Sequence, residues 1–260
     1  MPTTCRSRNQ EASPGAPIFG AVEAGLGELA GLAPSEVLRR RLERAALLLA
    51  AIESPPGLAS PGWAALLDAV TVQETRLFRA APQLLALSAL LPELPGRPLR
   101  LLSAGCASGE EAWSLAILAA KSRTRAEVLG LDLCRPALAT AEAGRYPAGP
   151  PDALREVPDA FRPWFIRDGG WVVPRFEDLS RPRFLRANLL APPEEIGRFG
   201  AILCRNVLIY LLPAARDAVL RGLVARLLPG GALLLGPTDS PPAGLPLRPE
   251  PGAHGIWRRS

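Results

Sequence analysis

The stretch L-R-L-L-S-A-G-C-A-S-G-E-E-A-W-S, residues Leu99–Ser114, decides the fold of this chain. It begins with a short apolar run, turns between Gly105 and Gly109, and continues through two glutamates into a helix-like pattern. A strand, a glycine turn and a helix in this order bring the backbone close to a nucleoside cofactor. A second apolar run, Val128–Leu131, ends in Asp132, where a carboxylate can accept hydrogen bonds from both ribose hydroxyls. An ordinary strand–helix–strand crossover would show the same two segments.

The charge of the turn selects among nucleoside cofactors. Its glycines do not follow G-x-G-x-x-G, and it lacks the lysine of a phosphate-binding loop. Glu110 and Glu111 would repel a pyrophosphate at the N-terminus of the following helix. A cofactor without phosphates that is cationic at sulfur suits this turn better. The sequence therefore predicts S-adenosylmethionine, with S-adenosylhomocysteine as the product.

Composition narrows the class of protein. A chain of 260 residues with 48% hydrophobic residues has room for one sizeable domain with an appendage, or for two small ones. The net charge of +5 comes almost entirely from arginine, because Lys121 is the only lysine. Aromatic residues make up 5% of the chain and do not alternate with basic ones, so no base-stacking surface is indicated. We expect no nucleic-acid partner.

Metal-binding and membrane signals are weak. The four cysteines have no C-x-x-C spacing and His254 is the only histidine, so we predict no metal site. The first residues contain no apolar segment typical of a signal peptide, and the apolar run Ala45–Ile52 is too short to span a bilayer. We therefore expect a cytoplasmic protein without membrane insertion.

The N-terminal part of the chain reads as helical. Residues 1–30 contain Pro and Gly without clear periodicity, and we predict a flexible tail there. Residues 31–95 are predicted to form a helical domain, in which Ser35 caps one long helix that reaches Ile52. That helix carries an arginine-rich face, formed by Arg39, Arg40, Arg41 and Arg44. A shorter helix is predicted at Trp63–Val70.

Residues 96–260 alternate between strand-like and helix-like segments. Predicted strands are Leu99–Ala104, Val128–Leu131, Ala201–Cys204 and Ala232–Leu235, with a last one at His254–Arg258. Predicted helices are Glu110–Lys121, Pro136–Gly144 and Pro213–Leu228. The alternation predicts an α/β fold with an open, mostly parallel sheet. The Pro-rich segment from about 146 to 186 breaks this rhythm and is predicted to be an inserted subdomain.

Polar residues follow several of these strands. They are Gly105–Glu111, Asp132, Asn188 after F-L-R-A, and the C-R-N sequence at Cys204–Asn206. Ligands of open α/β sheets bind beyond the carboxyl ends of the strands. The repetition of polar groups at one edge therefore indicates a single binding site.

Five stretches resemble, in order and spacing, the CheR-type chemoreceptor glutamate methyltransferases. They are T-V-Q-E-T-R-L-F-R from Thr71, S-A-G-C-A-S-G-E-E-A-W-S from Ser103, D-L-C-R-P-A-L-A-T-A-E-A-G-R-Y from Asp132, N-L-L from Asn188 and C-R-N-V-L-I-Y from Cys204. The similarity runs from about Gly62 to Gly236. It implies a Rossmann-like class I methyltransferase with a small antiparallel β-subdomain and a short N-terminal helical domain.

The resemblance also implies the roles of individual residues. Arg79 and Tyr210 would lie beside the reacting methyl group as the catalytic residues. The residues that would bind the cofactor are Gln73, Thr75, Arg79, Gly105, Glu111, Asp132, Asn188, Leu189, Arg205 and Asn206. The acceptor would be a glutamate side chain of a chemoreceptor, which is already ionised at neutral pH and needs no general base.

The chain departs from the family pattern at several positions. Gln73 stands where the family usually has Asn, Leu77 replaces an aromatic residue, and Trp113 replaces a Tyr. The loop Asp168–Val173 is short, so we expect no docking to a pentapeptide at receptor C-termini. We expect the arginine-rich helix Ser35–Ile52 to face a chemoreceptor-like helical protein. The alternatives are a cofactor-binding regulator with little turnover, a small-molecule methyltransferase and, more remotely, an RNA methyltransferase.

Overall fold

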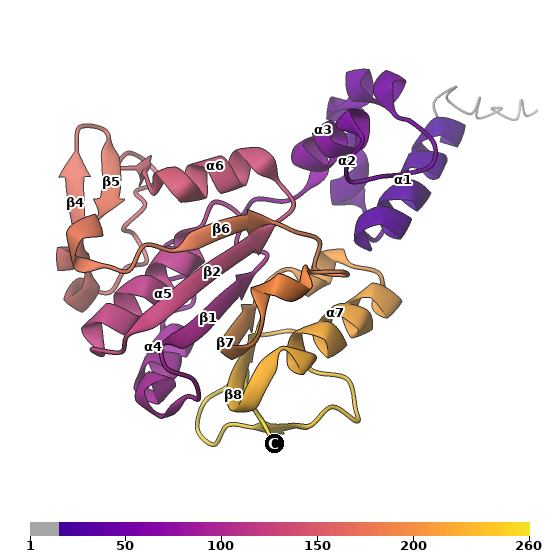
Figure 1. The fold of residues 1–260 in the computed structure, drawn as a ribbon. Coiled ribbons are helices and arrows are strands. Elements are labelled where there is room, and N and C mark those ends of the chain that lie inside the picture. Colours follow the sequence, from indigo (N-terminus) through magenta and orange to yellow (C-terminus); the bar gives the residue numbers. More distant parts are fainter. Residues whose placement is uncertain (1–15) are drawn as a thin grey trace, which may run out of the picture.

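A seven-stranded sheet forms the centre of the molecule (Figure 1). The computed structural model describes residues 16–260, with side chains from Phe19 onward. The strand order is β6-β2-β1-β7-β8-β10-β9. The first five strands in this order run parallel to one another, and β10 runs antiparallel to both of its neighbours, β8 and β9. The bounds are β1 (Leu99–Ala104), β2 (Ala126–Asp132), β6 (Arg183–Arg186), β7 (Phe199–Cys204), β8 (Leu227–Leu235), β9 (Leu247–Pro249) and β10 (Ile256–Arg259). This confirms the predicted α/β fold with a mostly parallel sheet.

Helices cover both faces of the sheet, which explains why its inner strands are almost wholly apolar. They are α4 (Ala81–Leu90), α5 (Glu110–Lys121), α6 (Arg135–Ala143) and α7 (Pro213–Ala225). On one face, α4 and α5 share a core with Leu101 and Leu203. On the other face, α7 packs on Leu102 and Ile202. Neighbouring residues of β1 and β7 thus face opposite cores, as alternation along a strand requires.

A second, three-stranded antiparallel sheet lies beside the first, in the order β3-β5-β4 (Figure 1). Its strands are β3 (Tyr146–Pro147), β4 (Phe165–Asp168) and β5 (Trp171–Pro174). The predicted insertion of residues 146–186 is therefore too long at its end, because Arg183–Arg186 pairs in parallel with β2. The sequence predicts a strand end at F-L-R-A before Asn188 but places it inside the insertion, because this edge strand alternates between exposed and half-buried residues and lacks the apolar run of the inner strands.

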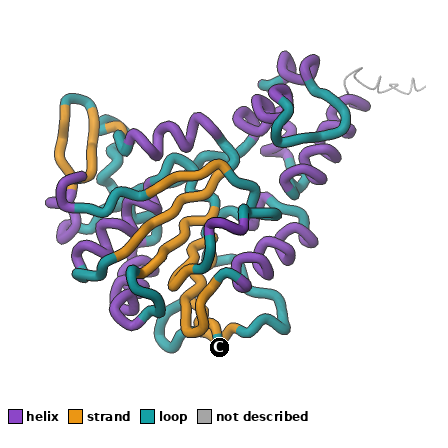
Figure 2. The backbone as a smooth tube through the Cα atoms, viewed as in Figure 1, coloured by secondary structure: helices purple, strands orange, loops and turns teal. Residues whose placement is uncertain are grey.

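Four helical segments form a separate cluster at one end of the sheet (Figures 1 and 2). They are α1 (Ala16–Ala30), α2 (Glu36–Arg44), the 3-10 helix η1 (Ala46–Ala51) and α3 (Pro61–Val70). The prediction of a flexible tail is wrong for residues 16–30, because Val22, Leu26 and Ala30 of α1 are buried against α2 and α3. Residues 1–15 of that predicted tail lie outside the described part of the chain.

The predicted long helix from Ser35 to Ile52 is also divided in two. Ser35 caps its start as expected, accepting a hydrogen bond from Leu38 N at 3.1 Å. The α-helix ends at Arg44, however, and η1 continues in tighter turns. The end of η1 lies directly on α3, where a Cβ at Gly62 would sit 2.0 Å from Ala51 O. Packing against α3 thus overrides the continuous periodicity of this segment.

Short 3-10 helices complete the described chain. They are η2 (Leu91–Glu93), η3 (Asp159–Trp164), η4 (Phe176–Asp178), η5 (Glu194–Ile196) and η6 (Leu208–Tyr210). Among residues 16–260 no helix combines the length and the hydropathy that crossing a membrane requires.

Candidate functional site

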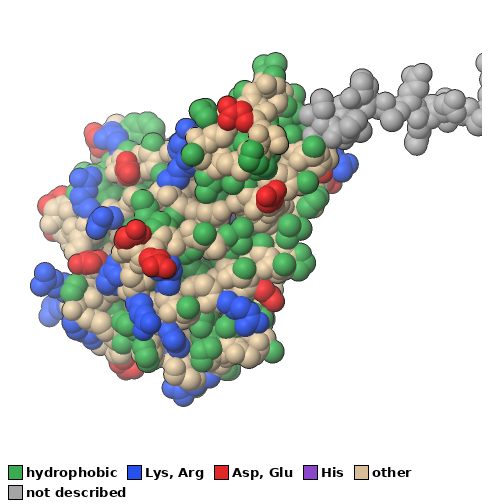
Figure 3. Space-filling view, turned by 45° about the vertical axis from the view of Figure 1, so that its right-hand side comes forward, with side chains coloured by type: hydrophobic (Ala, Val, Ile, Leu, Met, Phe, Trp, Pro, Cys, Tyr) green, Lys and Arg blue, Asp and Glu red, His purple; other side chains and the backbone are tan. Residues whose placement is uncertain are grey.

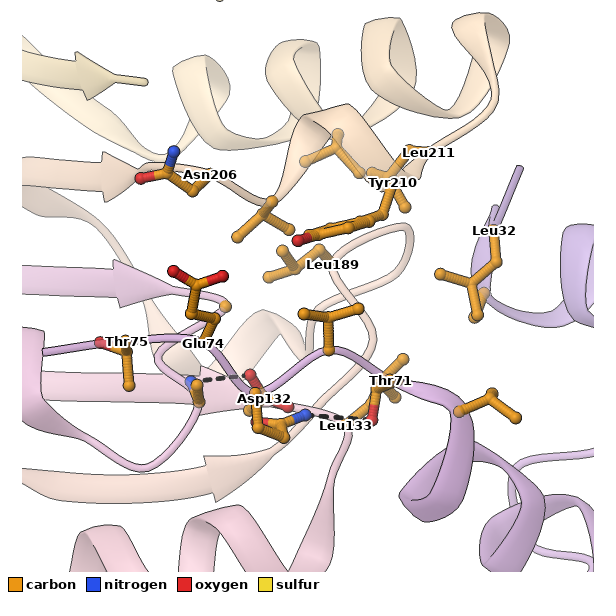
Figure 4. A pocket seen from close by; sticks show the side chains of 18 of the residues that line it. Leu32, Thr71, Glu74, Thr75, Asp132, Leu133, Leu189, Asn206, Tyr210 and Leu211 are labelled. Carbon is orange, nitrogen blue, oxygen red and sulfur yellow. Dashed lines mark hydrogen bonds between the residues drawn. The ribbon is translucent and has the colours of Figure 1, made fainter. Parts of the chain in front are cut away.

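A cavity of about 1230 Å³, including its open mouth, lies beyond the carboxyl ends of β1, β2 and β7. Its remaining walls come from α1, α2, the segment before α4 and the segment around η6. Every site residue predicted from the sequence lines it: Gln73, Thr75, Arg79, Gly105, Glu111, Asp132, Asn188, Leu189, Arg205, Asn206 and Tyr210. Figure 4 shows part of this lining. One edge of the sheet therefore brings the whole predicted set together.

The glycine turn after β1 forms the floor of the cavity. The backbone N–H groups of Gly105 and Cys106 donate to Leu131 O at 2.8 and 2.9 Å, which ties the turn to β2. Gly105 has a φ of 77°, and a Cβ there would lie 2.4 Å from a methyl group of Val207. Only glycine fits this conformation and this approach.

Asp132 is held in a fixed orientation at the end of β2. One carboxylate oxygen accepts from Ala107 N at 2.8 Å, and the other accepts from Cys134 N at 2.9 Å. Burial raises the pKa of Asp132, and these backbone hydrogen bonds oppose that rise. Each carboxylate oxygen can accept a further hydrogen bond, so both remain available to a pair of ligand hydroxyls.

Glu111 and Arg205 form a buried ion pair below the cavity. Arg205 Nε lies 2.7 Å from Glu111 Oε2, with the two side chains 3% and 11% exposed. The second carboxylate oxygen accepts from Ser103 Oγ at 2.7 Å. Arg205 Nη1 also donates to Arg79 O at 2.9 Å and Gln83 Oε1 at 3.2 Å. Both Glu111 and Arg205 thus already have protein partners. Sequence reasoning missed Gln83, which belongs to this network, because no motif surrounds it.

The segment from Thr71 to Thr75 crosses the cavity beside Asp132. Gln73 Nε2 donates to Thr71 Oγ1 at 3.0 Å, and Thr71 Oγ1 in turn donates to Leu67 O at 2.7 Å. Gln73 Oε1 is buried and has no hydrogen-bond partner among residues 16–260. A buried carbonyl oxygen without a donor is unfavourable, so this position suits a ligand that carries an N–H or O–H group.

Arg79 is paired with a residue that sequence reasoning missed. Its Nη1 donates to Glu74 O at 2.7 Å, and its Nη2 lies 3.7 Å from Glu74 Oε1. The Glu74 carboxylate also accepts from Arg76 at 2.8 Å. Glu74 lines the mouth of the cavity, where its carboxylate and the Tyr210 hydroxyl are turned toward the same space (Figure 4). Glu74 lies between two predicted contacts, Gln73 and Thr75, in the sequence, and this position could have identified it as a site residue.

Asn188 joins the sheet to the N-terminal helices. Its side-chain amide donates to Leu29 O at 2.7 Å, and its carbonyl oxygen accepts from Leu190 N at 3.0 Å. The end of α1 thereby becomes a wall of the cavity, with Ala30 and Leu32 in the lining. The sequence prediction had placed α1, including Ala30, in a flexible tail and Leu32 in the helical domain that follows it.

These groups fit S-adenosylmethionine. The cofactor has an amino group and ribose hydroxyls, which match the unpartnered Gln73 Oε1 and the two oxygens of Asp132. Leu133 and Leu189 add apolar surface suited to an aromatic base. No group of three potential metal ligands occurs in the described part of the chain.

Comparison with known proteins agrees with this geometry. A family model described as "CheR methyltransferase, SAM binding domain" matches residues 73–244. A chemotaxis protein methyltransferase of Vibrio anguillarum is 32% identical over 191 residues, which cover 68% of each chain. The chemotaxis protein methyltransferase 1 of Pseudomonas aeruginosa is 32% identical over 195 residues, covering 67% of this chain and 69% of that one.

A third relative, from Klebsiella aerogenes, is a chemotaxis protein methyltransferase that is 34% identical over 201 residues. That alignment covers 74% of this chain and 68% of the relative. The matched segments include the glycine turn and the strand ends that build the cavity. The chain therefore belongs to the CheR methyltransferase family and contains its S-adenosylmethionine-binding domain.

Proposed function

We propose that this protein transfers the methyl group of S-adenosylmethionine to glutamate side chains of a chemoreceptor-like helical protein. The product is a glutamyl methyl ester, and the reaction serves adaptation in chemosensory signalling. The observation that carries the proposal is the meeting of Arg79 and Tyr210 with the cofactor-binding set in one cavity. A guanidinium and a phenol at its mouth suit a carboxylate acceptor.

The chemistry needs orientation more than proton transfer. S-adenosylmethionine supplies an electrophilic methyl group. A carboxylate oxygen forms a bond to this carbon while the bond from carbon to sulfur breaks, and the sulfonium becomes a thioether. The carboxylate is ionised at neutral pH, so no base is required. The task of the protein is to strip water from the carboxylate and align it with the methyl group.

Arg79 is our choice for binding the acceptor carboxylate. Its Nη2 lies 3.7 Å from the Glu74 carboxylate and both residues line the cavity, which supports a carboxylate site beside this guanidinium. An incoming glutamate would take the place of Glu74 beside the guanidinium. The Tyr210 hydroxyl would then donate to the same carboxylate and keep it on the line of attack. We expect both side chains to be catalytic residues.

The cofactor would lie deeper in the cavity. We propose that Asp132 accepts from the ribose hydroxyls and that Gln73 Oε1 accepts from a donor of the cofactor. We propose that Glu111 and Arg205 also contact the cofactor, and that their ion pair keeps both side chains fixed at the floor of the cavity. The other proposed contacts come from backbone or side chains of Thr75, Arg79, Gly105, Asn188, Leu189 and Asn206.

The acceptor protein is proposed to dock along α2. Ser35, Val37 and Leu38 of this segment line the cavity, so α2 borders its mouth. Arg40 pairs with Glu36, and Arg41 donates to Thr71 O at 3.0 Å and so supports the site from within. Arg39 and Arg44 are exposed and form no ion pair among the described residues. They are the arginines best placed to attract an acidic helix.

Two further features support this choice of partner. On the face shown in Figure 3, basic and acidic side chains are interspersed, unlike the continuous basic surface typical of nucleic-acid binding. Strands β4 and β5 are joined by Gly169–Gly170 alone, which supports the expectation that no receptor pentapeptide docks there. We place the protein in the cytoplasm and expect no metal requirement.

The test is transfer of label from methyl-labelled S-adenosylmethionine to membranes that contain the organism's own chemoreceptors. We expect base-labile label on a receptor-sized band with the wild-type protein. Tyr210→Phe should retain cofactor binding by calorimetry and lose about 10- to 100-fold in rate. Arg221→Ala, an exposed arginine on α7, is the matched control and should leave the rate unchanged.

Two outcomes would contradict the proposal, and each would favour a different alternative function. Cofactor binding without label on any protein would favour a regulator with little turnover. Label that enters small molecules, with no dependence on Arg39 and Arg44, would favour a small-molecule methyltransferase.

A further inference from the structure

The backbone around Tyr210 is held from two sides. Three consecutive carbonyl oxygens, those of residues 209–211, each accept a hydrogen bond from outside η6. Arg216 Nη2 lies 3.5 Å from Ile209 O, and Arg216 Nε lies 2.8 Å from Leu211 O. Between them, Tyr210 O accepts from Ala33 N at 2.8 Å. A 3-10 helix of three residues has little stability of its own, so these outside donors set its position.

Arg216 suits this task because of its place and shape. It lies in the first turn of α7, where its own N–H bonds to Leu212 O at 2.9 Å. A guanidinium presents several donors in a rigid plane, so one side chain can reach both carbonyls that flank Tyr210. Burial raises the pKa of the Asp239 carboxyl and the charge of Arg216 opposes that rise, but the hydrogen bonds of the Arg216 side chain go to these two carbonyls. Its side-chain donors therefore serve the backbone of η6.

The opposite side is formed by a strap, which we define as residues Gly31–Ala33. Leu32 and Leu211 form an isolated antiparallel bridge, and Leu212 N donates to Gly31 O at 2.8 Å. Gly31 has a φ of 69°, and a Cβ there would lie 2.6 Å from the Cβ of Ala215 on α7. The strap thus lies against the same helix that carries Arg216. In Figure 4, Leu32 lies to the right of Tyr210 and Leu211.

We infer that Arg216 is a positioning residue that, together with the strap, holds Tyr210 in the orientation needed for methyl transfer. The inference rests on the proposed function, in which the Tyr210 hydroxyl orients the acceptor carboxylate. Arg216 itself does not line the cavity, so it acts through the backbone of η6. An error of about 1 Å in the placement of an orienting group can lower a rate about 100-fold.

The first test measures the anchoring without any acceptor. In Arg216→Ala, the amides of Leu211 and Leu212 should exchange with solvent at least about tenfold faster, because opening of the segment becomes easier. Arg216→Lys keeps one donor group and should restore part of the protection. Arg221→Ala, on the exposed face of the same helix, should exchange as the wild type does. Unchanged exchange in Arg216→Ala would overturn the inference.

The second test asks whether the effect on the reaction passes through Tyr210. Arg216→Ala should lower kcat about tenfold while the Kd for S-adenosylhomocysteine, measured by calorimetry, stays within about twofold, since Arg216 lies outside the cofactor set. In a Tyr210→Phe background the same substitution should lower kcat by less than about twofold, because coupled residues are not additive. Losses that simply multiply in the double variant would overturn the positioning role.

The two tests separate this inference from the proposed function. If wild-type protein methylates no protein, the proposed function fails, and amide exchange still decides whether Arg216 anchors η6. If methylation occurs but exchange in Arg216→Ala is unchanged, only the positioning inference fails.

Discussion

The floor and the outer wall of the cavity are built on different principles. On the floor, the side chains of Asp132, Glu111 and Arg205 each hold hydrogen-bond partners from neighbouring strands or turns. The outer wall comes from α1, α2 and the strap, where apolar packing and a few main-chain hydrogen bonds do the work. The hydrogen bonds of the floor therefore hold its side chains in place for one cofactor before it binds. The wall can shift without changing these hydrogen bonds.

The largest effect should come from breaking the floor. Arg205→Ala leaves Glu111 buried without its cation, and we expect a loss of about 3–5 kcal/mol in the free energy of unfolding. Denaturant unfolding monitored by tryptophan fluorescence measures this loss. Arg248→Ala, exposed on edge strand β9, is the control and should stay within about 0.5 kcal/mol of the wild type. A loss below about 1 kcal/mol in Arg205→Ala would show that the pair is not essential to the floor.

Breaking the wall should have a smaller effect. Leu26 of α1 is fully buried, so Leu26→Ala should lower the free energy of unfolding by about 2–4 kcal/mol. We expect the loss to be concentrated in α1 to α3, with rapid amide exchange there and near-normal exchange in β1 and β2. Hydrogen exchange by mass spectrometry measures both regions. Uniform loss of protection would contradict the separation of floor and wall, and Glu28→Ala, exposed on α1, serves as the control.

Cofactor affinity should depend on Asp132 of the floor. Asp132→Asn keeps the size of the side chain and removes the charge and one acceptor, so the Kd for S-adenosylhomocysteine should rise about 10- to 100-fold. Isothermal titration calorimetry gives this Kd directly. Asp217→Asn on the exposed face of α7 should bind as the wild type does. Equal affinities of Asp132→Asn and the wild type would exclude the ribose role.

The pH dependence of cofactor affinity should also reveal the role of the Asp132 carboxylate. Burial raises the pKa of Asp132, so this group gains a proton at a higher pH than an ordinary aspartate when the solution is acidified. The protonated form is a poorer acceptor, and cofactor affinity should therefore fall with decreasing pH. In Asp132→Asn this part of the pH dependence should vanish. Burial also raises the pKa of Glu110, so an unchanged profile in the variant would assign the effect to Glu110 instead.

Substitution of exposed arginines on the outer wall should have the smallest effect on the protein. Arg39→Ala combined with Arg44→Ala removes two exposed charges and should leave stability within about 0.5 kcal/mol of the wild type. Because such charges act mainly on encounter, KM for the receptor should rise about two- to tenfold at low salt while kcat is kept. Steady-state methylation at two salt concentrations measures this. Arg123→Ala, on the loop after α5, is the control; equal effects at both salt concentrations would contradict a role in encounter.

The same division explains what the sequence could predict. Strand β1, helix α5 and the residues at the strand ends were predicted correctly, because apolar runs and glycine turns are local signals. Helix α1 was missed because Gly20, Gly25 and Gly27 make the segment resemble a loop. Gly25 has a tertiary reason, since a Cβ there would lie 2.3 Å from the ring of Trp63. Packing of this kind overrides local propensity and cannot be read from spacing.

For the site, the sequence predicted which residues meet but not which partners they already have. Glu111 and Arg205 are 94 positions apart, and no local pattern shows that they form a pair. The same holds for Asn188, whose hydrogen bond to Leu29 spans 159 positions. The roles of the individual cofactor contacts stay predictions until they are tested by substitution.

The strap has a consequence for how the protein matures during synthesis. Its partners lie far along the chain, because Tyr210, Leu211 and Leu212 are made about 180 residues after the strap. When α1 leaves the ribosome, the strands and the η6 segment that it will touch do not yet exist. The N-terminal helices must therefore wait, packed on one another, until the parallel sheet has formed, and pairing at such sequence distance is slow. Because Arg205, Asn206, Tyr210 and Val219 line the cavity, its lining is complete only after these late residues have been made.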